Sequence, residues 1–191
     1  LFDFKNLFVL DIANNHQGSV SHGKAIIKEA SGIVKKHRVK AAIKFQFRQL
    51  NTFIHPSHLR NTEHKQLKRF MSTQLDIDKY KILFNEVKEN NLITMCTPFD
   101  EESVDIIKDM NFDVIKVASC SAKDWPLLEK ISETNLPIIF STGGLHITNI
   151  DDLVSFFNHR DCDFAIMHCV SLYPIPEKKF NLNQIEVLKK R

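Results

Sequence analysis

Two lysines interrupt apolar runs that are rich in β-branched residues. Lys44 lies within residues 41–47, and Lys116 lies within residues 114–117. Lysine is almost never fully buried without a partner, because taking an unpaired charge out of water is costly. An internal carboxylate such as that of Asp11 could neutralise one of them. For the pair, a bound phosphate or carboxylate is the favoured interpretation, and we expect an anion site.

Polar side chains gather at the ends of the apolar runs. Hydroxyl groups can donate hydrogen bonds to an anion held by the lysines. These hydroxyl residues are Thr97, Ser119, Ser141 and Ser171. His168 and Tyr173 follow the last run, and Gln46 alternates with Lys44 in the second. A single histidine without a second metal ligand in view is best interpreted as a satisfied rim residue.

The runs that carry these residues alternate with segments of helical period, which predicts βαβ units and a parallel sheet. The expected strands are residues 7–12, 41–47, 92–96, 114–117, 138–140 and 164–168. The expected helices are residues 21–36, 77–90, 101–110, 126–133, 149–158 and 181–191. The long connection of residues 48–76 should form an active-site loop with a short helix near residues 62–70.

Six such units leave two architectures open, a doubly wound open sheet or a barrel that lacks its last two units. No Gly-rich phosphate loop follows the first strand, which disfavours the open sheet. We therefore predict an α/β fold of the (β/α)8 TIM-barrel type, incomplete here, as a single domain over residues 1–191. In such barrels the active site lies at the carboxyl ends of the strands, where the polar residues recur.

Composition narrows the class of function further. The chain has 191 residues, of which 43% are apolar and 26% charged, with a net charge of +3 and no basic stripe. Nucleic acid is therefore not an expected partner. No run has the apolar length of a membrane span, so no membrane is expected and a cytoplasmic location is the default. The four cysteines show no C-x-x-C spacing, which indicates neither a disulfide framework nor a zinc site.

Six motifs in order, each at a predicted strand end, resemble those of the N-acetylneuraminate (sialic acid) synthase family, which includes legionaminic and pseudaminic acid synthases. The matching segments are residues 10–18 (LDIANNHQG), 43–46 (IKFQ), 97–99 (TPF), 115–119 (IKVAS), 140–144 (FSTGG) and 168–174 (HCVSLYP). The resemblance covers nearly the whole chain and agrees with the barrel prediction.

The resemblance implies that phosphoenolpyruvate and an open-chain amino sugar are the partners. The C3 carbon of phosphoenolpyruvate attacks the sugar aldehyde, water adds at C2, and phosphate leaves. It also implies that Lys44 and Lys116 neutralise phosphoenolpyruvate, while Asp11 occupies the family's glutamate position near the reacting carbons. The remaining implied contacts are Thr97, Ser119 and Ser141 with phosphoenolpyruvate, and Gln46 and Tyr173 with the sugar.

Some positions depart from the family pattern. Asp11 is one methylene shorter than the family's Glu. Ser121 stands at the position of a sugar-binding Glu, and Ser171 stands at the position of an Asn. These last two departures leave the identity of the sugar open. The family's divalent metal, Mn or Mg, is held by histidines on strands seven and eight, which would lie beyond Arg191. We therefore expect a fragment of a longer gene product, inactive by itself, that is a homodimer when full length.

Two other functions remain open. A Schiff-base aldolase would use Lys44 or Lys116 as its nucleophile. A degenerate barrel could instead serve as a binding or scaffold module, an interpretation that the departures at Asp11, Ser121 and Ser171 favour mildly.

Overall fold

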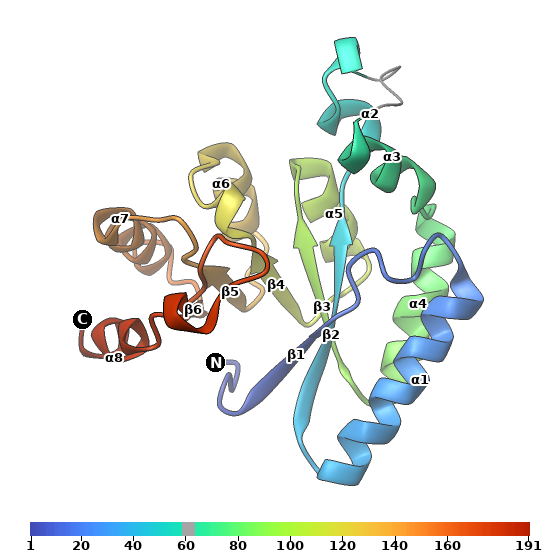
Figure 1. Cartoon of the computed structure of the whole chain (residues 1–191), viewed down its shortest axis with the longest axis horizontal. Helices are drawn as coiled ribbons and strands as arrows, with labels where there is room; N and C mark the ends of the chain where they lie inside the picture. Colours follow the sequence, from blue (N-terminus) through green and yellow to red (C-terminus); the bar gives the residue numbers. More distant parts are fainter. Residues whose placement is uncertain (59–63) are drawn as a thin grey trace. The chain divides into compact units, whose positions relative to one another are not determined.

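The structure is a computed structural model that describes residues 1–58 and 64–191 (Figure 1). Its internal contacts separate two compact units. One unit contains residues 3–113, and the other contains residues 114–191 together with Leu1 and Phe2. In both units strands alternate with helices along the chain.

The unit of residues 3–113 is built on three parallel strands in chain order. These strands are β1 (Leu7–Asp11), β2 (Lys40–Phe47) and β3 (Ile93–Pro98). Its longer helices are α1 (Val20–His37), α4 (Ile77–Glu89) and α5 (Glu101–Asp109). The amino ends of these three helices are capped by Ser19, Asp76 and Asp100, whose side chains accept backbone N–H groups that the helix leaves unpaired.

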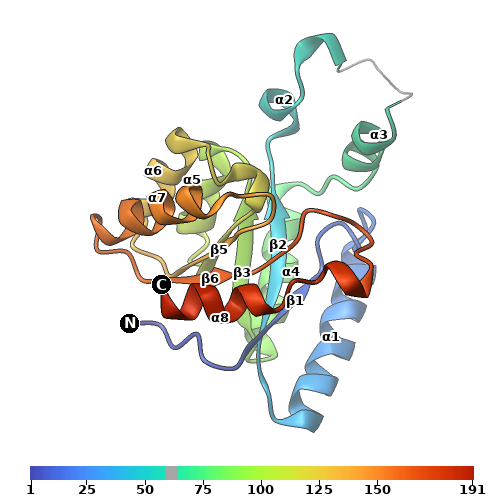
Figure 2. The same ribbon diagram turned by 60° about the vertical axis from the view of Figure 1, so that its left-hand side comes forward.

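A long insertion connects β2 to α4. It contains α2 (Leu50–Phe53), a 3₁₀ turn at Pro56–His58 and α3 (Lys65–Ser72). Figure 2 shows α2 and α3 beyond the carboxyl end of β2, while α1 and α4 lie side by side. The insertion is therefore placed where βα loops contribute to active sites.

The unit of residues 114–191 repeats the pattern. Its parallel strands are β4 (Val114–Val117), β5 (Ile138–Ser141) and β6 (Phe164–Met167). Its helices are α6 (Trp125–Ser132), α7 (Ile147–Asn158) and α8 (Asn183–Lys190), with 3₁₀ turns at Ser119–Ser121 and Glu177–Lys179.

Each unit buries an aromatic cluster behind its strands. Phe45 and Phe47 of β2 pack edge-on against Phe112, with ring centroids 6.2 and 5.6 Å apart. In the second unit Phe140 of β5 stacks on Phe157, with ring centroids 5.8 Å apart. Because side chains alternate along a strand, the neighbours of these phenylalanines on β2 point to the opposite face.

The six expected strands and the six expected long helices are confirmed, with ends that differ by one or two residues. The expected short helix is present as α3, and its predicted start at Thr62 lies outside the described residues. The assignment of the whole chain to a single domain stays a prediction. Over residues 1–58 and 64–191, we find no helix that is both long enough and apolar enough to span a membrane.

Candidate functional site

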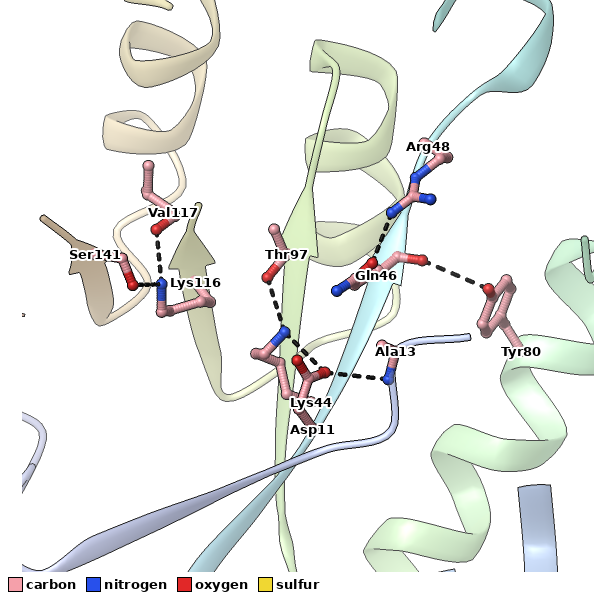
Figure 3. A network of polar contacts seen from close by, with 10 residues as sticks. All are labelled: Asp11, Ala13, Lys44, Gln46, Arg48, Tyr80, Thr97, Lys116, Val117 and Ser141. Atoms are coloured by element: carbon pink, nitrogen blue, oxygen red, sulfur yellow. Dashed lines mark hydrogen bonds and ion pairs between the residues drawn. The ribbon is translucent and has the colours of Figure 1, made fainter. Parts of the chain in front are cut away.

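Lys44 lies in a small polar group at the ends of β1, β2 and β3 (Figure 3). The lysine is 8% exposed, and its Nζ lies 2.9 Å from Asp11 Oδ1 and 3.4 Å from Thr97 Oγ1. Asp11 and Lys44 are register partners in the parallel pair β1–β2, so their side chains lie on the same face. The sheet therefore brings Asp11, Lys44 and Thr97 together.

The ion pair joins a buried ammonium to a carboxylate that is 47% exposed. Asp11 Oδ1 also accepts a hydrogen bond from the backbone N–H of Ala13 at 3.1 Å. The interpretation in which a protein carboxylate neutralises one of the lysines is thus confirmed for Lys44. Both contacts of Asp11 use Oδ1, so Oδ2 is the oxygen placed to exchange a proton with a ligand or water.

Lys116 lies in a second polar group, in the unit of residues 114–191. The side chain is 6% exposed, and its Nζ donates to Ser141 Oγ at 2.6 Å and to the carbonyl oxygen of Val117 at 2.8 Å (Figure 3). Lys116 and Ser141 come from the adjacent strands β4 and β5. The ammonium is therefore held at a strand end next to the Ser141 hydroxyl, which can itself donate a hydrogen bond to an anion.

Gly143 shows how closely other hydroxyl groups approach this strand end. A Cβ at position 143 would lie 2.5 Å from Cys169 Sγ, 2.8 Å from Ser171 Oγ and 3.2 Å from Ser119 Oγ. Only glycine leaves room for these side chains next to the backbone. Ser119 and Ser171 therefore lie next to Gly143, in the loop that follows Ser141.

Gln46 lies on the same face of β2 as Lys44 and opposite Thr97 in register. Its Oε1 accepts a hydrogen bond of 2.6 Å from Arg48 Nη2. A cavity of about 290 Å³ adjoins this strand end, and its lining includes Gln46, Arg48 and Tyr80. Arg48 was not predicted as a site residue, although its position two residues after Gln46 in an alternating strand was a usable signal.

His16 and Tyr80 organise the loop after β1. His16 is fully buried, and its Nδ1 accepts a hydrogen bond of 3.1 Å from the backbone N–H of Gly18. Burial, and to a lesser degree the charge of His22, lowers the pKa of His16. Burial also raises the pKa of Tyr80 far above its ordinary value, so the phenol stays protonated near the cavity.

The remaining predicted residues lie after β6. Tyr173 is 99% exposed, so the structure does not bring it to the hydroxyl groups near Gly143. His168 Nε2 lies 2.9 Å from the carbonyl oxygen of Phe180, which agrees with a satisfied rim histidine. Ser121, at the position of a sugar-binding Glu in the family pattern, is buried.

In the part of the chain that the structure describes, no group of three or more His, Cys, Asp or Glu side chains is placed to hold a metal ion. The four cysteines are free thiols.

Comparison with known sequences assigns the family. The NeuB family profile matches residues 33–191 of this chain. The chain belongs to the NeuB family. A Drosophila melanogaster relative named N-acetylneuraminate-9-phosphate synthase is 30% identical over 96% of this NeuB-family chain and 50% of its own length. Uncharacterised protein MJ1065 of Methanocaldococcus jannaschii is 35% identical over 92% of the chain and 49% of its own length.

Solved structures agree with this membership. A Chromobacterium violaceum structure assigned as spore coat polysaccharide biosynthesis protein E has a TM-score of 0.94 and 42% identity, over 97% of this chain and 55% of that one. A truncated 3-deoxy-D-arabino-heptulosonate 7-phosphate synthase from Thermotoga maritima, at 12% identity and a TM-score of 0.65, is a likeness of fold alone. The NeuB-family chain thus has the predicted incomplete (β/α)8 fold, and it spans about half the length of the curated relatives that it matches.

Proposed function

We propose that the full-length protein condenses phosphoenolpyruvate with an open-chain N-acetylated amino sugar aldehyde, forming a nonulosonic acid and phosphate in carbohydrate biosynthesis. The observation that carries the proposal is the buried Lys116 held on Ser141, with Ser119 and Ser171 converging nearby, in a chain of the NeuB family. The named synthases among its relatives support the same class of reaction.

In this proposal Lys116 binds an anionic group of phosphoenolpyruvate. Its ammonium is already fixed by short hydrogen bonds, so little reorganisation is needed when an anion arrives. Ser119 and Ser141 would donate hydroxyl hydrogen bonds to the same ligand. Ser171 would do so as well, because its hydroxyl converges on the same glycine.

Lys44, Asp11 and Thr97 would lie next to the carbons that react. C3 of phosphoenolpyruvate forms the new bond to the aldehyde carbon, and the aldehyde oxygen takes a proton. Water adds to C2, and one of its protons passes through Asp11 Oδ2 to the aldehyde oxygen. The C2–O bond to the phosphate then breaks, phosphate leaves with the electron pair and the bridging oxygen, and the C2 hydroxyl gives its proton to the phosphate as the ketone forms. Lys44 holds Asp11 through the ion pair at Oδ1 and so orients Oδ2 for this proton transfer.

Gln46 and Tyr173 are the residues proposed to contact the sugar. Gln46 is on the face of β2 that carries Lys44, which suits a residue that contacts the second substrate. Tyr173 is fully exposed here, so its sugar contact depends on an arrangement that the described residues do not form by themselves. Both assignments stay proposals.

The divalent metal, Mn or Mg, also stays a proposal for the full-length enzyme. The described residues offer no set of ligands for it, and no step above passes through it. The homodimer and the cytoplasmic location likewise remain expectations. The chain spans about half the length of the curated relatives that it matches, so the metal ligands and the dimer contacts are proposed for a protein of full length.

A Schiff-base aldolase is less well supported. Such an enzyme needs a neutral lysine amine with a lone pair, whereas Lys44 is an ammonium paired with Asp11 at 2.9 Å. A scaffold role would not require the convergence of Ser119 and Ser171 on Gly143. No contact among the described residues favours either alternative.

The proposal is tested with the full-length protein, phosphoenolpyruvate, N-acetylmannosamine or a diacetamido sugar, and Mn²⁺. We expect mass spectrometry to find a product in which pyruvate has been added to the sugar, with one phosphate per product. Borohydride should trap no substrate adduct on the protein. Failure to form any condensed acid with a panel of such sugars, or a trapped imine, would overturn the proposal.

A further inference from the structure

Arg48 follows β2 directly, and its guanidinium lies among three phenylalanine rings. Its Cζ is 4.2 Å from the ring centroid of Phe70, 4.5 Å from that of Phe99 and 5.8 Å from that of Phe53. Phe53 and Phe70 belong to α2 and α3 of the insertion, and Phe99 follows β3. A guanidinium is attracted to aromatic faces and stacks on them, so it connects the insertion to the strand ends.

The same guanidinium fixes the side-chain amide of Gln46. Arg48 Nη2 donates to Gln46 Oε1 at 2.6 Å (Figure 3). Arginine has only donors, so it can hold the amide only by its oxygen. The reverse orientation would set an NH₂ group against another donor. Arg48 therefore sets the orientation of the Gln46 amide, with the NH₂ group pointing away from the guanidinium.

The NH₂ group is the end that remains for a ligand. Gln46 lies on the face of β2 that carries Lys44, and its register partner on β3 is Thr97. In Figure 3 the amide nitrogen of Gln46 points away from Arg48. Because the amide oxygen is directed at Arg48, the amide presents its N–H donors to a ligand and so favours one with an acceptor oxygen.

The backbone on both sides of Arg48 is also held. The N–H of Phe99 donates to the carbonyl of Phe47 at 3.0 Å. The N–H of Gln49 donates to Asp100 Oδ2 at 2.7 Å, and Asp100 Oδ1 caps α5 by accepting from Ser103 N–H at 2.8 Å. These hydrogen bonds therefore fix the backbone position from which the Arg48 side chain extends.

We propose that Arg48 is a positioning residue: it holds the amide of Gln46 so that its NH₂ group donates to an acceptor oxygen of the sugar. The sugar part rests on the proposed function. Arg48 acts through Gln46 and touches neither substrate nor reacting atoms, and the insertion contributes by holding Arg48 between Phe53 and Phe70.

The first experiment compares Arg48→Met and Arg48→Lys in the full-length protein. Met fills the space between the rings and makes favourable sulfur–aromatic contacts, but it cannot donate to Gln46. We expect the KM for the sugar to rise about tenfold, with kcat and the KM for phosphoenolpyruvate within about twofold. Arg48→Lys can still donate to Oε1 and should remain within about threefold of the wild type.

A matched control separates this effect from the loss of a stacked arginine. Arg160 lies 3.8 Å from the ring centroid of Phe156 and pairs with Glu129 at 2.5 Å. Arg160→Met should leave all kinetic constants unchanged. Equal rises in both KM values for Arg48→Met, or no rise for the sugar, would overturn the positioning role.

A second readout does not depend on turnover. In protein labelled with ¹⁵N-glutamine, the NH₂ signals of Gln46 are identified by their loss in Gln46→Glu. We expect them to shift and to lose order in Arg48→Met and to be kept in Arg48→Lys; unchanged signals would overturn the proposal. If the wild type forms no condensed acid, the proposed function fails while this measurement still decides the positioning role.

Gln46→Glu also covers the case in which Arg48→Met does not fold. This variant keeps an acceptor for Arg48 and removes the NH₂ donor. We expect its KM for the sugar to rise about tenfold or more, with the KM for phosphoenolpyruvate within about twofold. An unchanged KM for the sugar would contradict the donor assignment.

Discussion

Lys44 and Lys116 are both buried, but their surroundings differ. Lys44 lies against the carboxylate of Asp11, whereas the contacts of Lys116 include a hydroxyl and a backbone carbonyl. An ion pair already satisfies much of the charge of Lys44. We therefore expect Lys116 to contribute more to the affinity for an anionic substrate.

Replacing Lys116 with Met tests this expectation. Hydrogen bonds to charged groups contribute about 1.5–3 kcal/mol, so the affinity for phosphoenolpyruvate should fall about tenfold to a hundredfold. The free energy of unfolding should fall by about 1–3 kcal/mol, because Met leaves the oxygen atoms of Ser141 and Val117 without their donor. Titration calorimetry of the full-length protein gives the affinity. Lys123→Met, at an exposed position, is the control, and equal affinities for both variants would contradict the assignment.

Replacing Asp11 with Asn tests the ion pair. The variant leaves the buried ammonium of Lys44 without its carboxylate, at a cost of about 1–3 kcal/mol in the free energy of unfolding, reduced because Asp11 is half-exposed. Urea unfolding at pH 7 measures this loss. Asp3→Asn breaks the more exposed pair with Lys40 and should cost little. A loss no larger than that of Asp3→Asn would show that the pair is not structural.

The lysines and hydroxyl residues could be predicted from the sequence because charged and polar residues within apolar strands are conspicuous. Pairing of Asp11 with Lys44 was foreseen as an alternative. The bond from Arg48 to Gln46 and the convergence on Gly143 were not. Both depend on side-chain rotamers and on contacts between segments that are distant in sequence. The hydrophobic periodicity of the sequence carries no information about either.

At the scale of elements, the loop between β1 and α1 depends on one buried histidine. His16 accepts from Gly18, whose φ of +73° sets the turn before the Ser19 cap. Protonation at Nδ1 would break this hydrogen bond. The loop carries the backbone N–H of Ala13 that contacts Asp11, so its order bears directly on the site.

The buried histidine predicts a pH dependence of stability. Burial, followed by the charge of His22, lowers the pKa of His16 below its ordinary 6.5. The unfolded chain therefore takes up the proton first, and stability is fully present above about pH 6.5 and falls as the pH drops toward the folded-state pKa. His16→Gln can still accept from Gly18 and should remove this component. Equal pH profiles of urea unfolding for the wild type and the variant would contradict the account.

The strands and long helices were predictable because each is long enough to show its period, and the helix starts at Ser19, Asp76 and Asp100 carry capping residues. The helix α2 was missed for a physical reason. It has one turn, and its first flanking residue, Gln49, makes no side-chain capping bond. A single turn is stabilised by tertiary contacts, here of Phe53 with Phe70 and Phe99.

At the scale of the whole molecule, the incomplete barrel and the family could be predicted from the sequence, because six motifs stand in order at the ends of six predicted strands. The sugar does not, because its recognition depends on side-chain orientation at Gln46 and on residues such as the exposed Tyr173. The chain spans about half the length of the curated relatives that it matches, and the condensation is proposed for a protein of their full length.

The most direct test follows the oxygen that bridges C2 and phosphorus in phosphoenolpyruvate. With this oxygen labelled as the heavy isotope, the full-length protein should release labelled phosphate only when both substrates are present. Lys116→Met should release it far more slowly at low phosphoenolpyruvate. Release from phosphoenolpyruvate alone, or a condensed acid that retains the label, would contradict the account.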